Sequence, residues 1–124
     1  MANYYLRSTD GNDGNAGTPA APWATMASAA SQMSAGDRCY VSDDHAELTA
    51  AAITIDSAGT PSSPIEFICI EDWGAETDPG SITHTASTGA SVGTNGEYNF
   101  TFKECLYCQG IAFGAGNGAG YARV

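Results

Sequence analysis

The chain has 124 residues, enough for one domain with a sizeable buried core. Fourteen acidic side chains against four basic ones give a formal net charge of −10 at pH 7. The basic residues stand singly, at Arg7, Arg38, Lys103 and Arg123. Nucleic acids and anionic membrane surfaces both attract clustered Lys and Arg, so the charge balance argues against both as partners.

The start of the chain predicts one strand, a long loop and one helix. Residues 4–7 are an aromatic and apolar run that predicts a strand, and residues 8–21 carry Asp, Gly, Asn, Thr and Pro, which favour turns. Residues 25–35 predict a short helix that Thr25 caps and Gly36 ends. Its apolar positions are Met26, Ala29, Ala30 and Met33, spaced i, i+3, i+4 and i+7.

The remainder predicts short strands separated by turns. The expected strands are residues 38–41, 52–55, 65–70, 81–85, 99–103 and 106–113. The expected turn-rich connections are residues 56–64, 72–80 and 86–97. Both faces of 65–70 are largely apolar, which is typical of a strand covered on each side. The pattern predicts an all-β domain with one leading helix and leaves a sandwich, a barrel and a solenoid open.

The loop after the first strand contains side-chain oxygens on a glycine-rich turn, an arrangement that suits a hard cation. The calcium candidates are Asp10, Asn12, Asp13 and Asn15. The loop lacks the spacing and the distal Glu of an EF-hand, and turn chemistry alone accounts for it equally well. Calcium is therefore a weak expectation, and no other cofactor is expected.

The densest group of ionisable residues follows the expected strand 38–41. It consists of Asp43, Asp44, His45 and Glu47. Carboxylates beside an imidazole perform acid–base catalysis or hold a metal, so these are the catalytic candidates if the protein is an enzyme. A solvated turn explains the same residues equally simply and is the favoured interpretation.

The four cysteines do not predict a disulfide scaffold. Cys105 and Cys108 form a C-x-x-C pair, the form used by redox and zinc sites, but Cys39 and Cys69 are isolated and supply no second pair. In an extended strand the odd spacing sends Cys105 and Cys108 to opposite faces. Core packing of at least one of them is the favoured interpretation.

The order of motifs at the start of the chain resembles a known family. A strand, the loop Tyr5-Leu-Arg-Ser-Thr-Asp-Gly-Asn-Asp-Gly, the segment Pro22-Trp-Ala-Thr, a helix and the strand Gly36-Asp-Arg-Cys-Tyr-Val follow one another, and Gly59-Thr with Pro64-Ile continues them. This resembles the start of pectin-lyase-like right-handed parallel β-helix proteins, in the branch that contains phage and viral structural proteins. The resemblance extends from the start of the chain to Ile70.

The resemblance implies one β-helix domain over residues 1–124, a single-stranded solenoid with a capping helix near 25–35. Residues 1–41 would form the cap and first rung, 42–113 further rungs, and 114–124 a glycine-rich tail. Trp23, Thr25, Gly36 and Tyr40 would be its structural residues. The tail is too rich in glycine to form a strand alone, so we expect an arm that a partner orders. The expected contact residues there are Gly114, Gly116, Gly118 and Tyr121.

Members of this family include lyases, hydrolases and virion components, so the fold alone does not give the function. Lyase chemistry on uronates needs clustered basic residues or calcium beside a base, and the basic residues of this chain are scattered. We therefore expect a non-enzymatic virion protein, a phage capsid decoration (cement) or tail-associated protein assembled in the host cytoplasm. By analogy with phage relatives it would form a homotrimer and bind a capsid or tail protein.

The alternative is the N-terminal fragment of a carbohydrate-active β-helix enzyme, a polysaccharide lyase or depolymerase, or a glycan-binding module. Glycoside hydrolysis requires two carboxylates that face one cleft. The candidates are Asp43, Asp44, Asp56, Glu71 and Asp72, but sequence cannot place any pair of them at the required separation. This alternative implies an extracellular location. The first residues contain no apolar segment or cleavage site that marks them for secretion, so the virion location is preferred.

Overall fold

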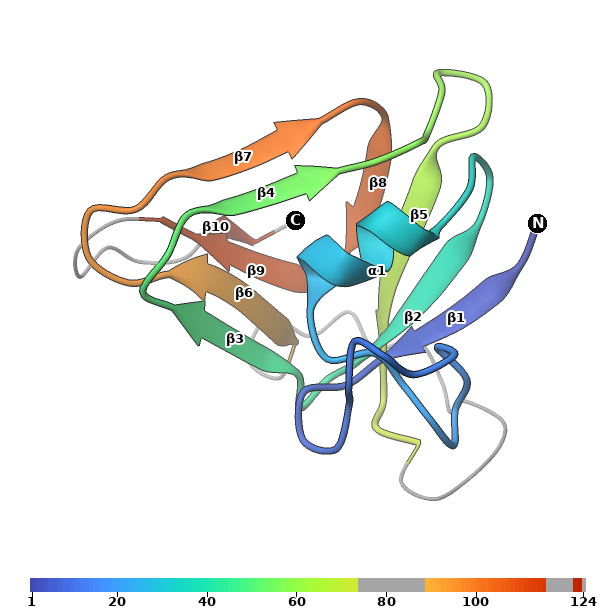
Figure 1. Ribbon diagram of the computed structural model, residues 1–124, viewed down its shortest axis with the longest axis horizontal. Coiled ribbons are helices and arrows are strands. Elements are labelled where there is room, and N and C mark those ends of the chain that lie inside the picture. Colours follow the sequence, from blue (N-terminus) through green and yellow to red (C-terminus); the bar gives the residue numbers. More distant parts are fainter. Residues whose placement is uncertain (74–88, 116–121, 124) are drawn as a thin grey trace.

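The computed structural model describes residues 1–73, 89–115 and 122–123 (Figure 1). Strands are the main secondary structure of these ranges, and they contain one short helix, as the sequence predicts. Within the same ranges no helix has the length and apolar character needed to span a membrane. The elements are β1 (Asn3–Leu6), α1 (Met26–Gln32), β2 (Arg38–Ser42), β3 (Ala46–Thr49), β4 (Ile53–Asp56), β5 (Ile65–Ile70), β6 (Ala90–Thr94), β7 (Phe100–Lys103), β8 (Leu106–Gln109), β9 (Ile111–Gly114) and β10 (Ala122–Arg123).

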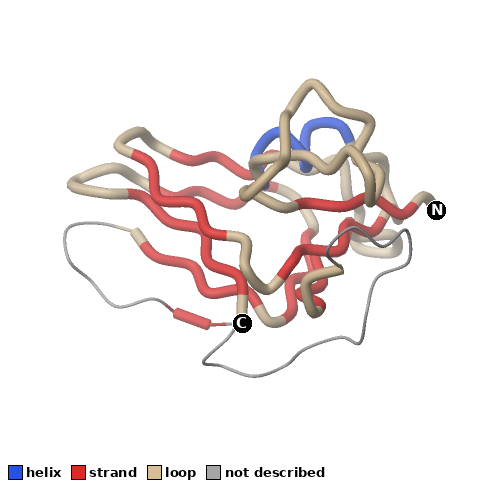
Figure 2. The backbone as a smooth tube through the Cα atoms, turned by 90° about the horizontal axis from the view of Figure 1, so that it is seen from below, coloured by secondary structure: helices blue, strands red, loops and turns tan. Residues whose placement is uncertain are grey.

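The strands form three sheets whose neighbouring strands are nearly all parallel. The sheet orders are β1-β2-β5-β8, β3-β6-β9 with β10 beside β9, and β4-β7; among these described strands only the β9–β10 pair is antiparallel. The chain passes through the three sheets in the same order twice, as β2, β3, β4 and then as β5, β6, β7. Within these two passages, strands consecutive in sequence lie in different sheets, and each strand pairs with its counterpart in the other passage. Figure 2 shows the paired strands running side by side.

The main core lies between the three sheets and is filled by the inward side chains of every passage. Aligned positions stack: Cys39 pairs with Phe67, and Phe67 pairs with Cys108. Phe67 is fully buried, as is Ile65. The other face of β5 is also covered, because Ile68 and Ile70 pack with Trp73, Tyr5 and Tyr40 in a second cluster. The prediction that both faces of this strand are covered is confirmed.

The helix α1 closes the core on the side of β4, against which it packs (Figure 1). Thr25 caps it as predicted, since its side chain accepts a hydrogen bond from the Ser28 amide at 3.4 Å. The helix is shorter than predicted, however. It ends at Gln32, because Met33 already has extended backbone angles and is itself buried. Gly36, with φ +87°, belongs to the turn before β2 and does not end the helix.

Two strands lie where turns were predicted, and one predicted strand is divided. β3 falls in the acidic stretch and alternates between exposed and half-buried residues, while β6 consists of small residues within the expected connection 86–97. Both form because they pair with each other in parallel register, which single-sequence patterns do not report. The expected strand 106–113 divides into β8 and β9 at Gly110, whose φ is +77°. The expected strand 81–85 lies outside the described residues.

Candidate functional site

The candidate site forms where the carboxyl ends of β1, β2 and β5 meet. Because these three parallel strands are neighbours in one sheet, the residues that follow them lie side by side. Arg7 follows β1 directly, Ser42 is the last residue of β2, and Asp72 lies two residues beyond β5. The topology thus brings one cation and several acidic side chains to the same edge.

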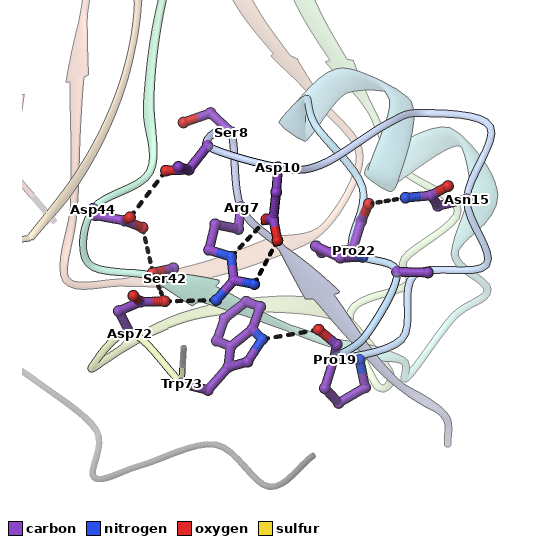
Figure 3. Close-up of polar contacts among 12 residues, drawn as sticks. Arg7, Ser8, Asp10, Asn15, Pro19, Pro22, Ser42, Asp44, Asp72 and Trp73 are labelled. Atoms are coloured by element: carbon purple, nitrogen blue, oxygen red, sulfur yellow. Dashed lines mark hydrogen bonds and ion pairs between the residues drawn. The ribbon is translucent and has the colours of Figure 1, made fainter. Parts of the chain in front are cut away.

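Arg7 is the centre of this group, and its side chain is only 8% exposed. Its Nε and Nη2 donate to the two carboxylate oxygens of Asp10 at 2.7 and 2.8 Å, and its Nη1 donates to Asp72 at 2.7 Å (Figure 3). The guanidinium carbon also lies 4.5 Å from the centre of the Trp73 ring. The hydrogen bond to Asp10 is the main reason why the pKa of Arg7 is raised, and the same bond lowers the pKa of Asp10.

Two further carboxylates share one hydroxyl group beside Arg7. The Ser42 Oγ lies 2.5 Å from Asp44 Oδ1 and 3.1 Å from Asp72 Oδ1, and Ser42 is fully buried. Thr9 donates to the other oxygen of Asp44 at 2.9 Å. The Asp43 carboxylate accepts the Asp72 amide at 3.1 Å, which fixes the chain just after β5. The strand ends are therefore tied together through acidic side chains.

An open depression of about 480 Å³ lies over this group. Its lining residues are Arg7, Thr9, Asp10, Pro19, Ala20, Asp44 and Asp72. Paired carboxylates beside an open depression are the arrangement that glycoside hydrolysis uses. Here Asp72 is held by a nearly buried guanidinium and Asp44 by two hydroxyl groups, so both carboxylates already stabilise the fold.

The structure divides the acidic sequence cluster between two places. Asp44 lines the depression and Asp43 bonds to the Asp72 amide, whereas His45 is buried and bonds to Glu47, with Nε2 2.7 Å from Oε2. The same Glu47 oxygen accepts the Met26 amide at the start of α1 at 2.9 Å. Because Glu47 is an acceptor, His45 Nε2 carries a proton in this contact. His45 Nδ1 is buried and has no hydrogen-bond partner among the described residues. These four residues therefore do not form one acid–base centre.

The calcium candidates bond to the protein itself. Asp13 makes the most contacts, because one of its oxygens accepts the Ala24 and Thr25 amides at 3.0 and 2.9 Å and the other accepts the Thr25 hydroxyl at 2.8 Å. The remaining contacts are Arg7 to Asp10, the Gly14 amide to Asn12 at 2.8 Å, and Asn15 to the Pro22 carbonyl at 2.9 Å. The described residues contain no group of three or more His, Cys, Asp or Glu side chains placed to hold a metal. The loop oxygens hold the entry to α1, and calcium binding stays an untested expectation.

Trp23 and Tyr40 occupy the two covered faces of the β1–β2 region. Trp23 is 2% exposed, stacks on Tyr4 with ring centres 4.7 Å apart, and donates from Nε1 to the Asn15 carbonyl at 2.8 Å. Tyr40 packs in the outer cluster beside Tyr5, with ring centres 5.6 Å apart. Both side chains thus contribute to the packing of the β1–β2 region.

Sequence reasoning named Asp72 only as one of several carboxylates that could serve glycoside hydrolysis, and it missed Arg7 and Trp73. Each lies at or just after the end of an expected strand, and Asp72 stood at the start of a predicted connection. The signal that could have found them is the rule that residues after neighbouring parallel strands gather at one edge. Applying that rule requires knowing that 4–7 and 65–70 belong to one parallel sheet.

All four cysteines are free thiols. Cys39 and Cys69 are fully buried, and Cys108 packs against the main core from β8. Burial raises the pKa of Cys39, and burial raises the pKa of Cys108 to about 12, so neither thiol is activated as a nucleophile. Cys105 precedes β8 and is half-buried.

The predicted partner contacts in the glycine-rich tail are only partly described. Gly114 is the last residue of β9, while Gly116, Gly118 and Tyr121 lie outside the described residues. Beyond them, Ala122 and Arg123 form β10, which pairs with Phe113 and Ala112 of β9.

Comparison with known proteins adds no relative from which a function can be carried over. No family model, curated protein or solved structure matches the chain. Function is therefore inferred from the geometry and from the family resemblance of the N-terminal part of the chain.

Proposed function

We propose that the chain is a non-enzymatic virion structural protein built on a short right-handed parallel β-helix. The three sheets are then the three faces of the helix, and each passage of the chain through them is one rung. The repeated order of the sheets and the stacked column Cys39–Phe67–Cys108 support this architecture. The family resemblance of the N-terminal part of the chain points the same way. In this arrangement α1 is the cap of the first rung.

The observation that carries the assembly role is the contrast between the two ends of the β-helix. The first end is covered by α1 and the loop before it, which pack into the main core. At the other end β7 and β8 are edge strands among the described residues. Phe102 and Tyr107 on these strands are 45% and 48% exposed. Open strand edges beside exposed aromatic side chains are surfaces that need a partner.

The partner proposed is the virion itself: the protein decorates a phage capsid or joins the tail, as a homotrimer that binds a capsid or tail protein. The decisive experiment measures the mass of the purified chain by light scattering and tests by mass spectrometry whether it co-purifies with phage particles. A trimer that is also present on particles is the expected result. A monodisperse monomer that never accompanies particles would refute the proposal.

One observation favours a second function, the carbohydrate-active alternative. Asp44 and Asp72 share the Ser42 hydroxyl under an open depression, which places two carboxylates close together. A reducing-sugar assay on bacterial polysaccharides tests it, with Asp44→Asn as the inactivating variant and Asp56→Asn, at an exposed pair elsewhere, as the matched control. Activity that Asp44→Asn abolishes and Asp56→Asn retains would establish an enzyme. If the wild type and both variants release no more reducing sugar than buffer alone, this alternative is excluded for the polysaccharides assayed.

A further inference from the structure

The outer edge of β8 has backbone donors and acceptors that pair with no other strand in residues 1–73, 89–115 and 122–123. The Cys105 carbonyl accepts the Ile65 amide at 3.3 Å, so the polar groups of Cys105 face β5. Backbone groups alternate in direction along a strand, so the N–H and C=O of Leu106 and Cys108 point away from β5. In the described part of the chain no strand follows β8 in its sheet. Leu106 and Cys108 therefore each offer one N–H and one C=O group with which a further parallel strand could form hydrogen bonds.

An apolar depression of about 280 Å³ lies beside this edge. It is lined by Phe102, Glu104, Leu106, Cys108 and Phe113. The rings of Phe102 and Phe113 meet edge to face with centres 5.0 Å apart, and they form one wall. A strand added to β8 would place every second side chain over this depression, because side chains alternate between the two faces of a strand.

Charge restricts what can bind at this edge. Glu104 is exposed and is the one charged residue among those that line the depression. The neighbouring cation, Lys103, is directed to Asp56 at 3.5 Å. Lys and Arg stand singly in this chain, so a second copy offers no strand with basic residues on both flanks, and the copies of a homotrimer would meet at other surfaces. A basic side chain of another protein is attracted to Glu104.

We infer that the β8 edge binds an extended segment of a different protein, a strand with alternating apolar side chains flanked by Lys or Arg. The segment adds in parallel to β8, forms hydrogen bonds with Leu106 and Cys108, and covers the depression with its apolar side chains. This is strand addition to an open sheet edge, in which the main chain supplies affinity and the side chains supply specificity. The inference rests on the proposed assembly role and names the chemical class of the partner.

The test is an NMR titration of the whole chain with two synthetic peptides. The first is acetyl-Lys-Val-Thr-Val-Thr-Val-Lys-amide, and the second has Glu in place of both Lys residues. With the first peptide at about 1 mM, we expect shifts of the Leu106 and Cys108 amide signals and weaker or no shifts with the second. Shifts confined to other strands, or no shifts with either peptide, would overturn the inference.

Two variants and one control sharpen the titration. Leu106→Pro removes an outward N–H at the first position of β8, where Pro is tolerated, and should abolish binding. Glu104→Gln keeps the fold, because Glu104 is exposed, and should weaken binding of the Lys peptide about two- to fivefold. Tyr107→Thr, on the opposite face of β8, should bind normally. If Leu106→Pro unfolds, the Glu104→Gln result decides, and unchanged affinity in that variant contradicts the predicted basic flank.

The same samples separate this inference from the proposed function. A dimer of the isolated chain whose interface signals map to β8 would make a second copy the occupant and would overturn the inference. Particles that retain both wild-type and Leu106→Pro chains would also overturn it, while leaving the assembly role intact. Peptide binding at β8 by a chain that never accompanies particles would instead retain the edge site and refute the virion role.

Discussion

The two ends of the parallel sheets differ in how the chain covers them. The closed end is the one covered by the loop after β1 and by α1, and the open end is the one formed by β7 and β8. At the first end the loop after β1 and the helix α1 lie over the core, and Trp23 and Met26 in this region are almost completely buried. At the open end Phe102 is 45% exposed beside an apolar depression. Parallel strands leave the edges of a stack unsatisfied, so closure depends on segments outside the strands.

Backbone geometry shows the same contrast. A Cβ atom on Gly11 would lie 2.2 Å from the Arg7 carbonyl oxygen, and one on Gly17 would lie 2.8 Å from the Trp23 ring, so the loop at the closed end fits tightly. At the open end Glu104 has φ +63°, a left-handed conformation that favours glycine. The open end also has a tightly packed glycine, because a Cβ atom on Gly59 would lie 2.1 Å from the Cys105 carbonyl oxygen. The difference lies at Glu104, where a charged residue adopts a left-handed conformation.

Replacing one aromatic residue at each end should give the largest difference. Trp23→Ala removes a buried ring that stacks on Tyr4, and we expect a loss of about 3–5 kcal/mol in the free energy of unfolding. Phe102→Ala is the matched control at the open end, with an expected loss of about 1 kcal/mol because nearly half of its side chain is already in water. Urea unfolding measures both. Equal losses would mean that the two ends are equally closed.

The next prediction concerns the carboxylate that holds the entry to α1. Asp13→Ala removes three hydrogen bonds to Ala24 and Thr25, and we expect a loss of about 2 kcal/mol. Asp56→Ala is the control, because the Asp56–Lys103 pair is exposed on both sides and should contribute about 0.5 kcal/mol or less. Repeating the Asp13→Ala measurement with calcium and with EDTA tests the metal expectation. A loss that exists only in calcium would show that the loop is a cation site.

The sequence predicted the elements whose signal is local. Residues 38–41 and 65–70 have apolar faces, and Thr25 is a good helix cap, so these elements were predicted close to their observed bounds. Leu48, the large apolar residue of β3, is exposed, and β6 consists mainly of small residues, so neither strand has a buried apolar face that the sequence marks strongly. They are strands because they pair with each other although they lie far apart in the sequence, and such pairing is a tertiary effect.

The candidate site was only partly predictable for the same reason. Asp43 and Asp44 were recognised from their local charge density. Asp44 lines the depression together with Asp72, and Asp43 holds the Asp72 backbone through a hydrogen bond. His45 and Glu47 belong to the same short run, yet alternation along β3 and the corner before it sends them towards α1. The density of acidic residues in the sequence therefore pointed to the region of the candidate site but did not show which residues form it.

A third variant uses the strain at the open end. Glu104→Gly places a residue without a Cβ at φ +63°, and we expect a gain of about 0.5–1 kcal/mol in the free energy of unfolding. The same change at Glu97, in the connection before β7, is the control and should not stabilise the protein, because Glu97 has no positive φ. Thermal unfolding of the two variants compares them. If Glu104→Gly is less stable than the wild type, the Glu104 side chain stabilises the protein by more than its left-handed backbone conformation costs.

The smallest expected effect tests whether the ion pair at the closed end contributes charge as well as geometry. The pKa of Asp10 is lowered, first of all by the hydrogen bond from Arg7. A carboxyl group whose pKa is lower in the folded state adds stability above its unfolded pKa of about 3.9, and this stability is lost as the pH falls through the folded value. Asp10→Asn should therefore cost about 0.5 kcal/mol near neutral pH, a modest amount because the Asp10 side chain is 53% exposed.

The stabilisation by Asp10 decreases once the pH falls below the unfolded pKa, and below the folded pKa the wild-type carboxyl is neutral like the Asn side chain. The two stability curves should therefore converge as the pH falls. Arg7 keeps its contacts with Asp72 and Trp73 in the variant, and the fold should therefore survive across the whole range. Urea unfolding at several pH values between about 6 and 3 measures the convergence. A difference that stays constant with pH would show that Asp10 acts only through the shape of the loop, and the closed end would then owe its stability to packing alone.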